Sequence, residues 1–313
     1  MLTSAPRRAS TVDAVLLGVA LVWGSSYLVA KDLTAVAPVL VVLALRYVLS
    51  AAALVAVGVG RRTGLPRGGH LWVGVLLGCT QAAVLVLETF GVAATSATNA
   101  GLLISLTIVL TPMLDSVWSR TWLPAPFFVA TVVAVLGVAL LVSGHGFRTP
   151  TVGDVLVLAA AAVRALHVSL IGRLTRGRAE SSLTLTTVQA VVGAVGLGAV
   201  AAHRLAATVP RLSFDSWARL AYLAFASSVF AFLAQTWAVR RTSASRASLL
   251  MGTEPVWAVL VGVGLGAEPL SPVGTVGAVL IVAATFWGQR VERRHRLTVR
   301  AKREPVALAP AQS

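Results

Sequence analysis

The sequence predicts an all-α integral membrane protein with ten transmembrane helices, built from two inverted repeats of five helices. Three observations support this fold class: an apolar composition, ten apolar segments long enough to cross a bilayer, and an internal repeat. Of the 313 residues, 57% are hydrophobic and only 12% are charged, which is far too apolar for a soluble globular protein. The formal charge of +15 lies in short clusters between apolar segments, so it indicates membrane topology rather than nucleic-acid binding.

The first five predicted helices follow a short N-terminal tail, residues 1–11. A helix rises 1.5 Å per residue, so about 17 to 23 apolar residues cross a hydrocarbon core about 30 Å thick. Arg7 and Arg8 precede the first apolar run as in a secretory signal, but the run is long enough to span the bilayer and has no Ala-x-Ala-like cleavage site. We therefore interpret it as a helix. The five segments are residues 12–30, 38–60, 70–90, 97–118 and 126–143.

Five further apolar segments of the same length follow. Gly and Pro lie inside several of them, which membrane helices tolerate. The segments are residues 152–171, 183–202, 217–238, 244–265 and 270–288. The remaining residues, 290–313, are rich in Arg and then in Ala and Pro, and we expect a disordered tail that touches anionic lipid headgroups. No segment suggests a separate soluble domain.

The distribution of Lys and Arg predicts the orientation of the chain. Nineteen of the 26 basic residues fall on the side of the membrane that holds both termini, five fall on the other side, and Arg46 and Arg164 lie inside spans. Cytoplasmic loops retain positive charge during insertion. We therefore expect both termini in the cytoplasm of a bacterial cell, with the chain in the inner membrane.

Two internal matches predict a duplication. Residues 95–103 and 242–250 share the pattern Thr-Ser-Ala-[Thr/Ser]-x-Ala-[Gly/Ser]-Leu-Leu, and residues 135–142 resemble 275–282, at offsets of 147 and 140 residues. The division falls after Gly144, which gives repeats at 12–144 and 145–289. Because five is an odd number of spans, the second copy must insert upside down relative to the first. Secondary transporters commonly use inverted repeats, with the substrate site between them near the midplane.

Short motifs along the chain resemble those of a known family. They are Val22-Trp-Gly-Ser-Ser-Tyr27 followed by Lys31, Leu45-Arg46-Tyr47, the Thr-Ser-Ala-x-x-Ala-Gly start at Thr95, Thr111-Pro112, Glu254-Pro255-Val256-Trp257 and Gly266-Ala267-Glu268. In this order the chain resembles the EamA-type transporters of the drug/metabolite transporter (DMT) superfamily. The resemblance implies export or exchange of small metabolites, such as amino acids or drug-like compounds. Ser119-Arg120 departs from the Gly-Glu ending that many relatives have at that position.

Polar and aromatic residues inside the spans are the candidates for a substrate pathway. A charged side chain at the bilayer centre costs at least about 2.5–3.5 kcal/mol, so it normally faces a bundle interior or water. The candidates are Trp23, Ser26, Tyr27, Gln81, Glu88, Asn99, Thr107, Thr111, Asp115, Arg164, His167, Ser228, Gln235, Glu254 and Trp257. The aromatic residues Trp23, Tyr27, Trp237 and Trp257 either stack on a planar substrate or anchor span ends at the interface.

The charged candidates each allow two interpretations. Arg164, one turn from His167, either binds a substrate anion or forms a structural salt bridge with Asp115 or Glu254. Glu254 either carries a coupling proton or satisfies backbone groups that Pro255 leaves free. Arg46 is also charged but is not placed among the candidates, because a structural role is favoured for it, through an ion pair or by extension to the interface.

The uncharged candidates follow helical spacing. Gln81 and Glu88 are seven residues apart and share one face, where they line a cavity unless Glu88 lies among headgroups. Ser228 and Gln235 have the same spacing in the eighth span. The polar stripe of Thr107, Thr111 and Asp115, spaced every four residues, faces either a substrate or a neighbouring helix. Asn99 is a weaker candidate.

An integral-membrane enzyme acting on a small or lipid substrate is the alternative class. The sequence has no Gly-x-Ser-x-Gly elbow, no His-Glu-x-x-His and no cluster of metal ligands. The single cysteine, Cys79, excludes a disulfide within the chain and a cysteine metal site. We therefore predict a secondary transporter without catalytic residues, metal or cofactor, whose partners are a small-molecule substrate and the lipid bilayer.

Overall fold

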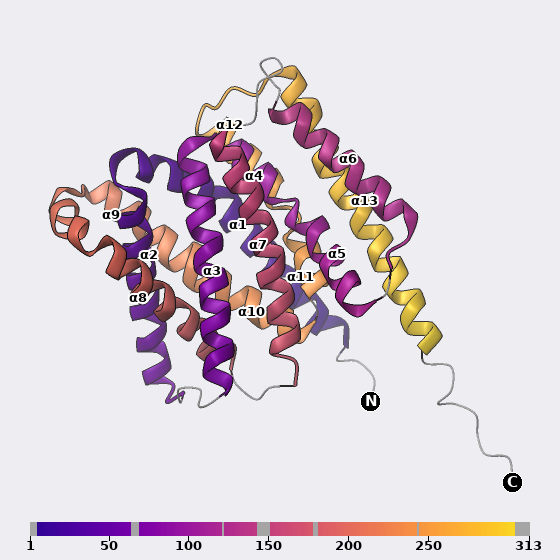
Figure 1. Cartoon of the computed structure of the whole chain (residues 1–313), viewed down its shortest axis with the longest axis horizontal. Coiled ribbons are helices and arrows are strands. Elements are labelled where there is room, and N and C mark those ends of the chain that lie inside the picture. The colour runs from indigo at the N-terminus through magenta and orange to yellow at the C-terminus, as the bar shows by residue number, and fades with distance from the viewer. Residues whose placement is uncertain are drawn as a thin grey trace, which may run out of the picture.

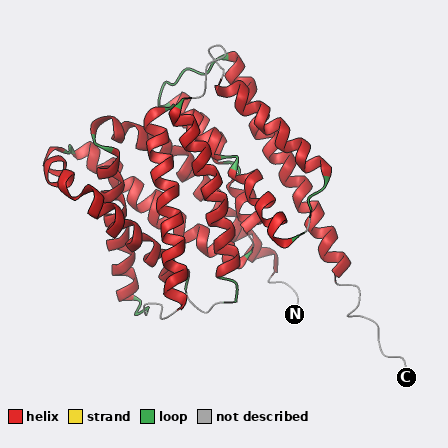
Figure 2. Ribbon diagram, viewed as in Figure 1, coloured by secondary structure: helices red, strands yellow, loops and turns green. Residues whose placement is uncertain are grey.

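The computed structural model describes residues 5–63, 69–120, 122–142, 151–177, 181–242 and 244–303, which form helices joined by turns and loops (Figure 1, Figure 2). The first half contains α1 (Ala5–Val36), α2 (Val39–Gly60), α3 (Gly69–Ala94), α4 (Ala97–Ile104), α5 (Thr107–Ser119) and α6 (Ala125–Val142). The second half contains α7 (Val152–Leu174), α8 (Ser182–Thr208), η1 (Val209–Arg211), α9 (Phe214–Ala221), η2 (Tyr222–Phe230), α10 (Ala231–Arg241), α11 (Ala244–Met251), α12 (Glu254–Gly264) and α13 (Pro272–Arg303). The all-α prediction is confirmed for this part of the chain.

Eight helical stretches in the described residues are long and apolar enough to cross a membrane. They correspond to eight of the ten predicted spans. At the fifth predicted position α6 is a helix of 18 residues, and at the ninth the span is divided between α11 and α12. The chain is therefore a multi-pass membrane protein, and the ninth predicted span is not one continuous helix.

Helix α1 is longer at both ends than the predicted span 12–30. Beyond residue 30 the sequence holds no helix-breaking residue before Pro38, so the helix continues to Val36. Asp32 lies in this added turn and forms an ion pair with Arg219. The extension therefore ties α1 to α9.

The fourth predicted span is interrupted between α4 and α5. At the interruption the N–H of Leu106 bonds to the carbonyl of Leu103, 3.2 Å away and three residues back, which tightens the turn. Ser105 Oγ donates to the carbonyl of Leu102 at 2.6 Å. Such side-chain bonds compete with the regular helical ladder.

The ninth predicted span is interrupted at Gly252 and Thr253, between α11 and α12. Pro255 lies in the first turn of α12, where its missing N–H has no helical partner to lose. The two interruptions occupy equivalent places, since α4 and α11 begin 147 residues apart, and so do α5 and α12. This is the offset of the repeated Thr-Ser-Ala pattern.

The eighth predicted span consists of α9, η2 and α10 in direct succession. η2 is a π-helix of nine residues, a wide turn that often occurs at functional sites. Its buried residues include Ser227 and Ser228. The wide turn therefore places two neighbouring hydroxyl groups inside the bundle.

Helix α13 continues into the basic C-terminal segment. We expected a disordered tail at 290–313, whereas the helix runs to Arg303. The first proline after residue 290 is Pro305, and Arg, Lys and Glu are good helix formers. Residues 304–313 and 1–4 lie outside the described part of the chain. α13 packs along α6 at one side of the bundle (Figure 1).

Glycines allow the closest helix crossings. A Cβ at Gly101 of α4 would lie 2.1 Å from Ala258 Cβ of α12, and one at Gly24 of α1 would lie 2.5 Å from Trp257 Cβ. At the contact of α6 and α13, a Cβ at Gly137 would lie 2.8 Å from the carbonyl oxygen of Gly277. Only hydrogen fits at these contacts, so α12 lies directly against α1 and α4.

Candidate functional site

A small polar cavity lies beside Trp23, in the middle part of α1. Apolar clusters pack around both halves of this helix, one with Leu16 and Val19 and the other with Ala30 and Leu33. The cavity has a volume of about 20 Å³, which is room for about one water molecule. Its lining residues are Trp23, Arg46, Gln81, Val84, Leu85, Glu88, Arg164, His167, Phe232 and Gln235.

Helix α3 supplies four of these residues. Gln81, Val84, Leu85 and Glu88 follow the spacing i, i+3, i+4 and i+7, which places them on one helix face. The predicted association of Gln81 with Glu88 is therefore found in the structure, and Glu88 lines a cavity.

Arg164 forms a bidentate ion pair with Glu254 at the edge of this cavity. The distances are 3.1 Å from Nη1 to Oε1 and 3.0 Å from Nη2 to Oε2, and the two side chains are 8% and 6% exposed. Tyr27 donates its hydroxyl hydrogen to the same carboxylate, and the guanidinium lies 4.1 Å from the ring centroid of Trp23. Of the two interpretations of Arg164, the structure contains the salt bridge with Glu254.

Trp23 contacts three different groups of the surrounding helices. Its Nε1 donates to the carbonyl of Ser227 at 2.9 Å, and its ring lies 5.6 Å from that of Phe232 in a tilted arrangement. Together with the contact to Arg164, these partners occupy much of the surface that a planar substrate would need.

Arg46 is buried, and none of its hydrogen-bond partners in the described part of the chain is acidic. Its Nε donates to Ser228 Oγ at 2.7 Å and its Nη2 to Ser227 Oγ at 2.9 Å. These two bonds use two of the five guanidinium N–H groups. Hydroxyl groups solvate the charge but do not neutralise it, so Arg46 retains donors for an anion in the cavity.

Two other polar groups on the cavity lack hydrogen-bond partners among the described residues. Gln81 is buried and its Oε1 has no partner. Glu88 makes no hydrogen bond and no ion pair to the described part of the chain. Most buried polar atoms in proteins are satisfied, which leaves Gln81 Oε1 in need of a partner. Glu88 is partly buried and holds a carboxylate inside a membrane span, where it too can accept a partner from outside the described chain.

His167 and Gln235 complete the polar lining. His167 Nδ1 lies 2.8 Å from Thr80 Oγ1, and this hydroxyl lies within bonding distance of the carbonyls of Leu76 and Leu77. When the hydroxyl donates to a carbonyl, it accepts from Nδ1–H and leaves Nε2 as the acceptor of a neutral ring. Gln235 Nε2 has only a weak sulfur contact, at 3.9 Å, with Met251.

The remaining candidates lie outside the cavity lining. Thr107 donates to the carbonyl of Ala161 in α7 at 3.2 Å, as the neighbouring-helix interpretation of this stripe expects, whereas Thr111 donates to the carbonyl of Thr107 within α5 at 2.7 Å. Ser26 bonds to the carbonyl of Trp23. Asn99, Asp115 and Trp257 are partly exposed and are not brought to the cavity.

Arg46 and Phe232 line the cavity although the sequence had not placed them among the candidates. A structural role was favoured for Arg46, and the structure gives it serine partners and a place on the lining. Phe232 offered no polar signal. Its position three residues before Gln235 on the same span was the available clue, because residues i and i+3 share a helix face.

One end of the bundle is tied together by Glu268. Its carboxylate accepts the backbone N–H groups of Ala97, at 2.7 Å, and Thr98, at 2.8 Å, and pairs with Lys31 Nζ at 2.9 Å. Burial acts to raise the pKa of Glu268, but the N–H of Thr98, the Lys31 ammonium and the N–H of Ala97 outweigh it and hold the pKa below its ordinary value. The start of α4, the end of α1 and the segment after α12 are therefore joined here.

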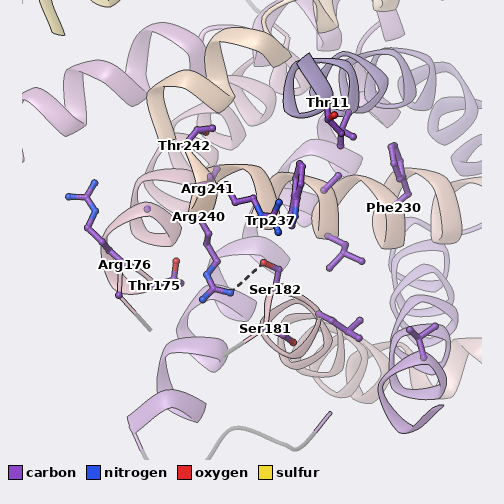
Figure 3. A pocket seen from close by; sticks show the side chains of 18 of the residues that line it. Thr11, Thr175, Arg176, Ser181, Ser182, Phe230, Trp237, Arg240, Arg241 and Thr242 are labelled. Carbon is purple, nitrogen blue, oxygen red and sulfur yellow. Dashed lines mark hydrogen bonds between the residues drawn. The ribbon is translucent and has the colours of Figure 1, made fainter. Parts of the chain in front are cut away.

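The other end of the bundle contains a large cavity, which we call the basic vestibule (Figure 3). Its volume is about 850 Å³, and it includes Thr11 of α1, which lies about 30 Å along the helix from Lys31. Four arginines line it: Arg61, Arg176, Arg240 and Arg241. The bundle therefore contains a large cavity at one end, and the ion pair of Lys31 with Glu268 joins its segments at the other end.

These features define an integral membrane protein with a polar centre inside an all-helical, multi-pass bundle. The chain belongs to the EamA-like transporter family, whose sequence profile matches residues 10–143 and 151–287. The resemblance seen in the sequence motifs is thus confirmed. The family points to a transporter rather than an enzyme.

Individual relatives agree with this assignment. The chain is 27% identical over 201 residues to an uncharacterized transporter of Archaeoglobus fulgidus, with 64% of this chain and 62% of the relative covered. It is 24% identical over 209 residues to the uncharacterized transporter YyaM of Bacillus subtilis, covering 65% and 68% of the two chains. The alignment thus spans less than two thirds of the archaeal protein.

A solved crystal structure shares the fold. It superposes with a TM-score of 0.68 at 17% sequence identity, and the alignment covers 89% of this chain and 98% of the other. At this identity the likeness establishes the fold and carries nothing about the substrate.

Proposed function

We propose that the protein is a secondary transporter that exports or exchanges small metabolites by alternating access. The observation that carries the proposal is a set of three polar groups around one cavity: Arg46 without an acidic hydrogen-bond partner, Glu88 without a hydrogen bond and Gln81 with an unpaired side-chain oxygen, in each case among the described residues. Polar groups inside a membrane bundle are expensive unless something binds them. A solute that passes through the site supplies the missing partners.

The difference between the two ends of the bundle supports alternating access. The basic vestibule opens one end, and the contacts of Glu268 join the helices at the other. A transporter that works by alternating access must close one side while the other is open. Here the end with the basic vestibule is open, and the end with Glu268 is closed by contacts between helices. With both termini in the cytoplasm of a bacterial cell, as the distribution of basic residues indicates, the basic vestibule faces the cytoplasm.

Three features support inverted repeats as the architecture behind this mechanism. The interrupted helices begin at the same offset of 147 residues in both halves. α2 packs on α8, and α6 packs on α13, as expected if each pair lies across a pseudo-twofold axis. Gly137 and Gly277, which matched in the sequence repeat, face each other at the second contact. Interrupted helices and a midplane site are typical of such transporters.

The charges of the cavity favour a zwitterionic metabolite such as an amino acid. The free N–H groups of Arg46 suit a carboxylate, which guanidinium binds in a bidentate manner, while Glu88 suits an ammonium group. Phe232 and Leu85 on the same lining suit an apolar side chain. The volume of about 20 Å³ is too small for such a solute, so binding requires the cavity to widen.

Reconstitution tests the function. The purified full-length protein in liposomes is challenged with a panel of amino acids and other metabolites, and we expect saturable flux of at least one solute. Glu88→Gln, which removes charge without breaking an existing contact, is expected to lower flux of that solute at least about tenfold. Asp215→Asn at the start of α9 removes a carboxylate far from the cavity lining, together with its exposed ion pair to Arg219, and as the control it retains flux. Absence of saturable flux together with hydrolysis of a solute would establish an enzyme instead.

A further inference from the structure

We propose that the basic vestibule is an anion site that binds a phosphate or carboxylate group. This goes beyond transport, since the site binds its ligand whether or not the ligand crosses the membrane. Its guanidinium groups come from separate parts of the chain: Arg61 after α2, Arg176 after α7, and Arg240 and Arg241 at the end of α10. Among the described residues that line the vestibule there is no Asp or Glu.

The start of α8 adds to this positive environment. Ser181 caps the helix by accepting the N–H of Thr184 at 3.0 Å, and both Ser181 and Ser182 line the vestibule. The N-terminal end of a helix carries a partial positive charge. Low-dielectric walls with charges of one sign concentrate the field inside a cavity, so an anion is attracted here more strongly than to an open surface.

Basic residues at a membrane edge commonly reflect only the orientation of the chain in the membrane. Two observations on these arginines are not explained by orientation. Arg240 extends across the vestibule so that Nη1 lies 3.4 Å from Ser182 Oγ, and the Arg241 guanidinium lies 4.6 Å from the ring centroid of Trp237 (Figure 3). These side chains enclose a cavity rather than project from it. Its volume of about 850 Å³ also lies within the range of small-molecule sites.

The apolar part of the lining shows what else the ligand carries. Phe230 and Val57 lie on the vestibule and remain 42% and 45% exposed, so the cavity has apolar walls beside its basic ones. An anionic group with an apolar portion fits this division. Both an anionic phospholipid headgroup and the acidic end of a soluble solute have this chemistry, and a binding experiment separates them.

Trp237 provides the readout because it lines the vestibule. The full-length protein in phosphatidylcholine nanodiscs is titrated with inorganic phosphate at constant ionic strength, and in a second arm part of the lipid is replaced by phosphatidylglycerol. We expect a saturable change of tryptophan fluorescence in at least one arm that disappears in Trp237→Phe. A response to phosphate identifies a soluble anion as ligand, and a response to phosphatidylglycerol alone identifies the lipid.

Charge variants separate the site from general electrostatics. Arg176→Gln and Arg61→Gln break no hydrogen bond or ion pair with other described residues, and each is expected to weaken binding about tenfold, as loss of one charge-assisted contact implies. Arg120→Gln is the matched control, because Arg120 is exposed and does not line the vestibule. The proposal is overturned by a wild-type protein that responds in neither arm, or by Arg120→Gln weakening the response as much as Arg176→Gln.

Discussion

Arg164 and Glu254 form an ion pair in which each side chain is less than one-tenth exposed. Removing one partner of such a pair leaves a buried charge and costs about 3–5 kcal/mol, whereas replacing both can be neutral. Tyr27 and Trp23 add contacts to the same pair. The pair therefore contributes to the way α1, α7 and α12 fit together, and Arg164 is less available to a solute than Arg46.

The first prediction concerns this pair. Arg164→Met is expected to lower the free energy of unfolding by about 3–5 kcal/mol, because Glu254 loses its buried counter-charge. The double variant Arg164→Met/Glu254→Gln is expected to recover most of that loss, since glutamine is neutral and still accepts a hydrogen bond from Tyr27. Unfolding in detergent micelles measures both. Additive losses in the double variant would show that the charges do not interact energetically.

The second prediction concerns Glu268. Its lowered pKa means that the ionised form stabilises the native state, and that this contribution is complete above the ordinary pKa of glutamic acid, about 4.3. It is lost as the pH falls through the lowered pKa. The difference in thermal stability between wild type and Glu268→Gln is therefore expected to be constant near neutral pH and to shrink in acid. A difference that grows as the pH falls would contradict the assignment.

At the level of single residues, the sequence predicted which positions are polar and which of them share a helix face. Gln81 and Glu88 line the same cavity because residues seven positions apart lie on the same face of a helix. The sequence could not decide whether Arg164 pairs with Asp115 or with Glu254, because this depends on how the helices pack against one another in three dimensions. The partners of Arg46 could not be predicted for the same reason: its two serine partners lie in the wide turn of η2, for which the local sequence has no signal.

At the level of elements, the two interrupted helices bring α12 against both α1 and α4. The gap that glycine leaves at position 101 decides how closely α4 and α12 approach. The sequence predicted continuous helices at 97–118 and 244–265, because apolar periodicity continues across both interruptions. The local bonds that tighten the turn at Ser105 carry no hydropathy signal.

The third prediction tests this contact. Gly101→Ala places a methyl group 2.1 Å from Ala258 Cβ, and such overpacking is expected to cost about 1–3 kcal/mol. Adding Ala258→Gly removes the opposing methyl group and restores most of the stability. Gly198→Ala in α8, where a Cβ meets nothing within 4 Å, is the control and changes little. Failure of Ala258→Gly to rescue would place the strain elsewhere, for example against Tyr27.

At the level of the whole molecule, composition and the length of apolar segments correctly predicted a multi-pass helical membrane protein, and the resemblance of the sequence motifs predicted its family. Eight of the ten predicted spans reach the length of a membrane-crossing helix. Of the other two, the fifth corresponds to the 18-residue helix α6, and the ninth is divided between α11 and α12. Hydropathy does not resolve such a division. The relation between the halves was visible in the sequence at 95–103 and 242–250, and the equal positions of the helix interruptions strengthen it.

The charges around the central cavity have an electrical consequence. With both carboxylates ionised, Arg46 and Arg164 balance Glu88 and Glu254, so the empty centre carries no net charge. Moving one elementary charge across a membrane potential is worth about 2.3 kcal/mol per 100 mV, but a balanced centre loaded with a zwitterion moves none. We therefore expect flux of a zwitterionic solute in liposomes to be unchanged when a potassium gradient with valinomycin imposes a voltage. Flux that follows the voltage would reveal a net charge on the moving centre, whereas insensitivity would mean that concentration gradients alone drive this carrier.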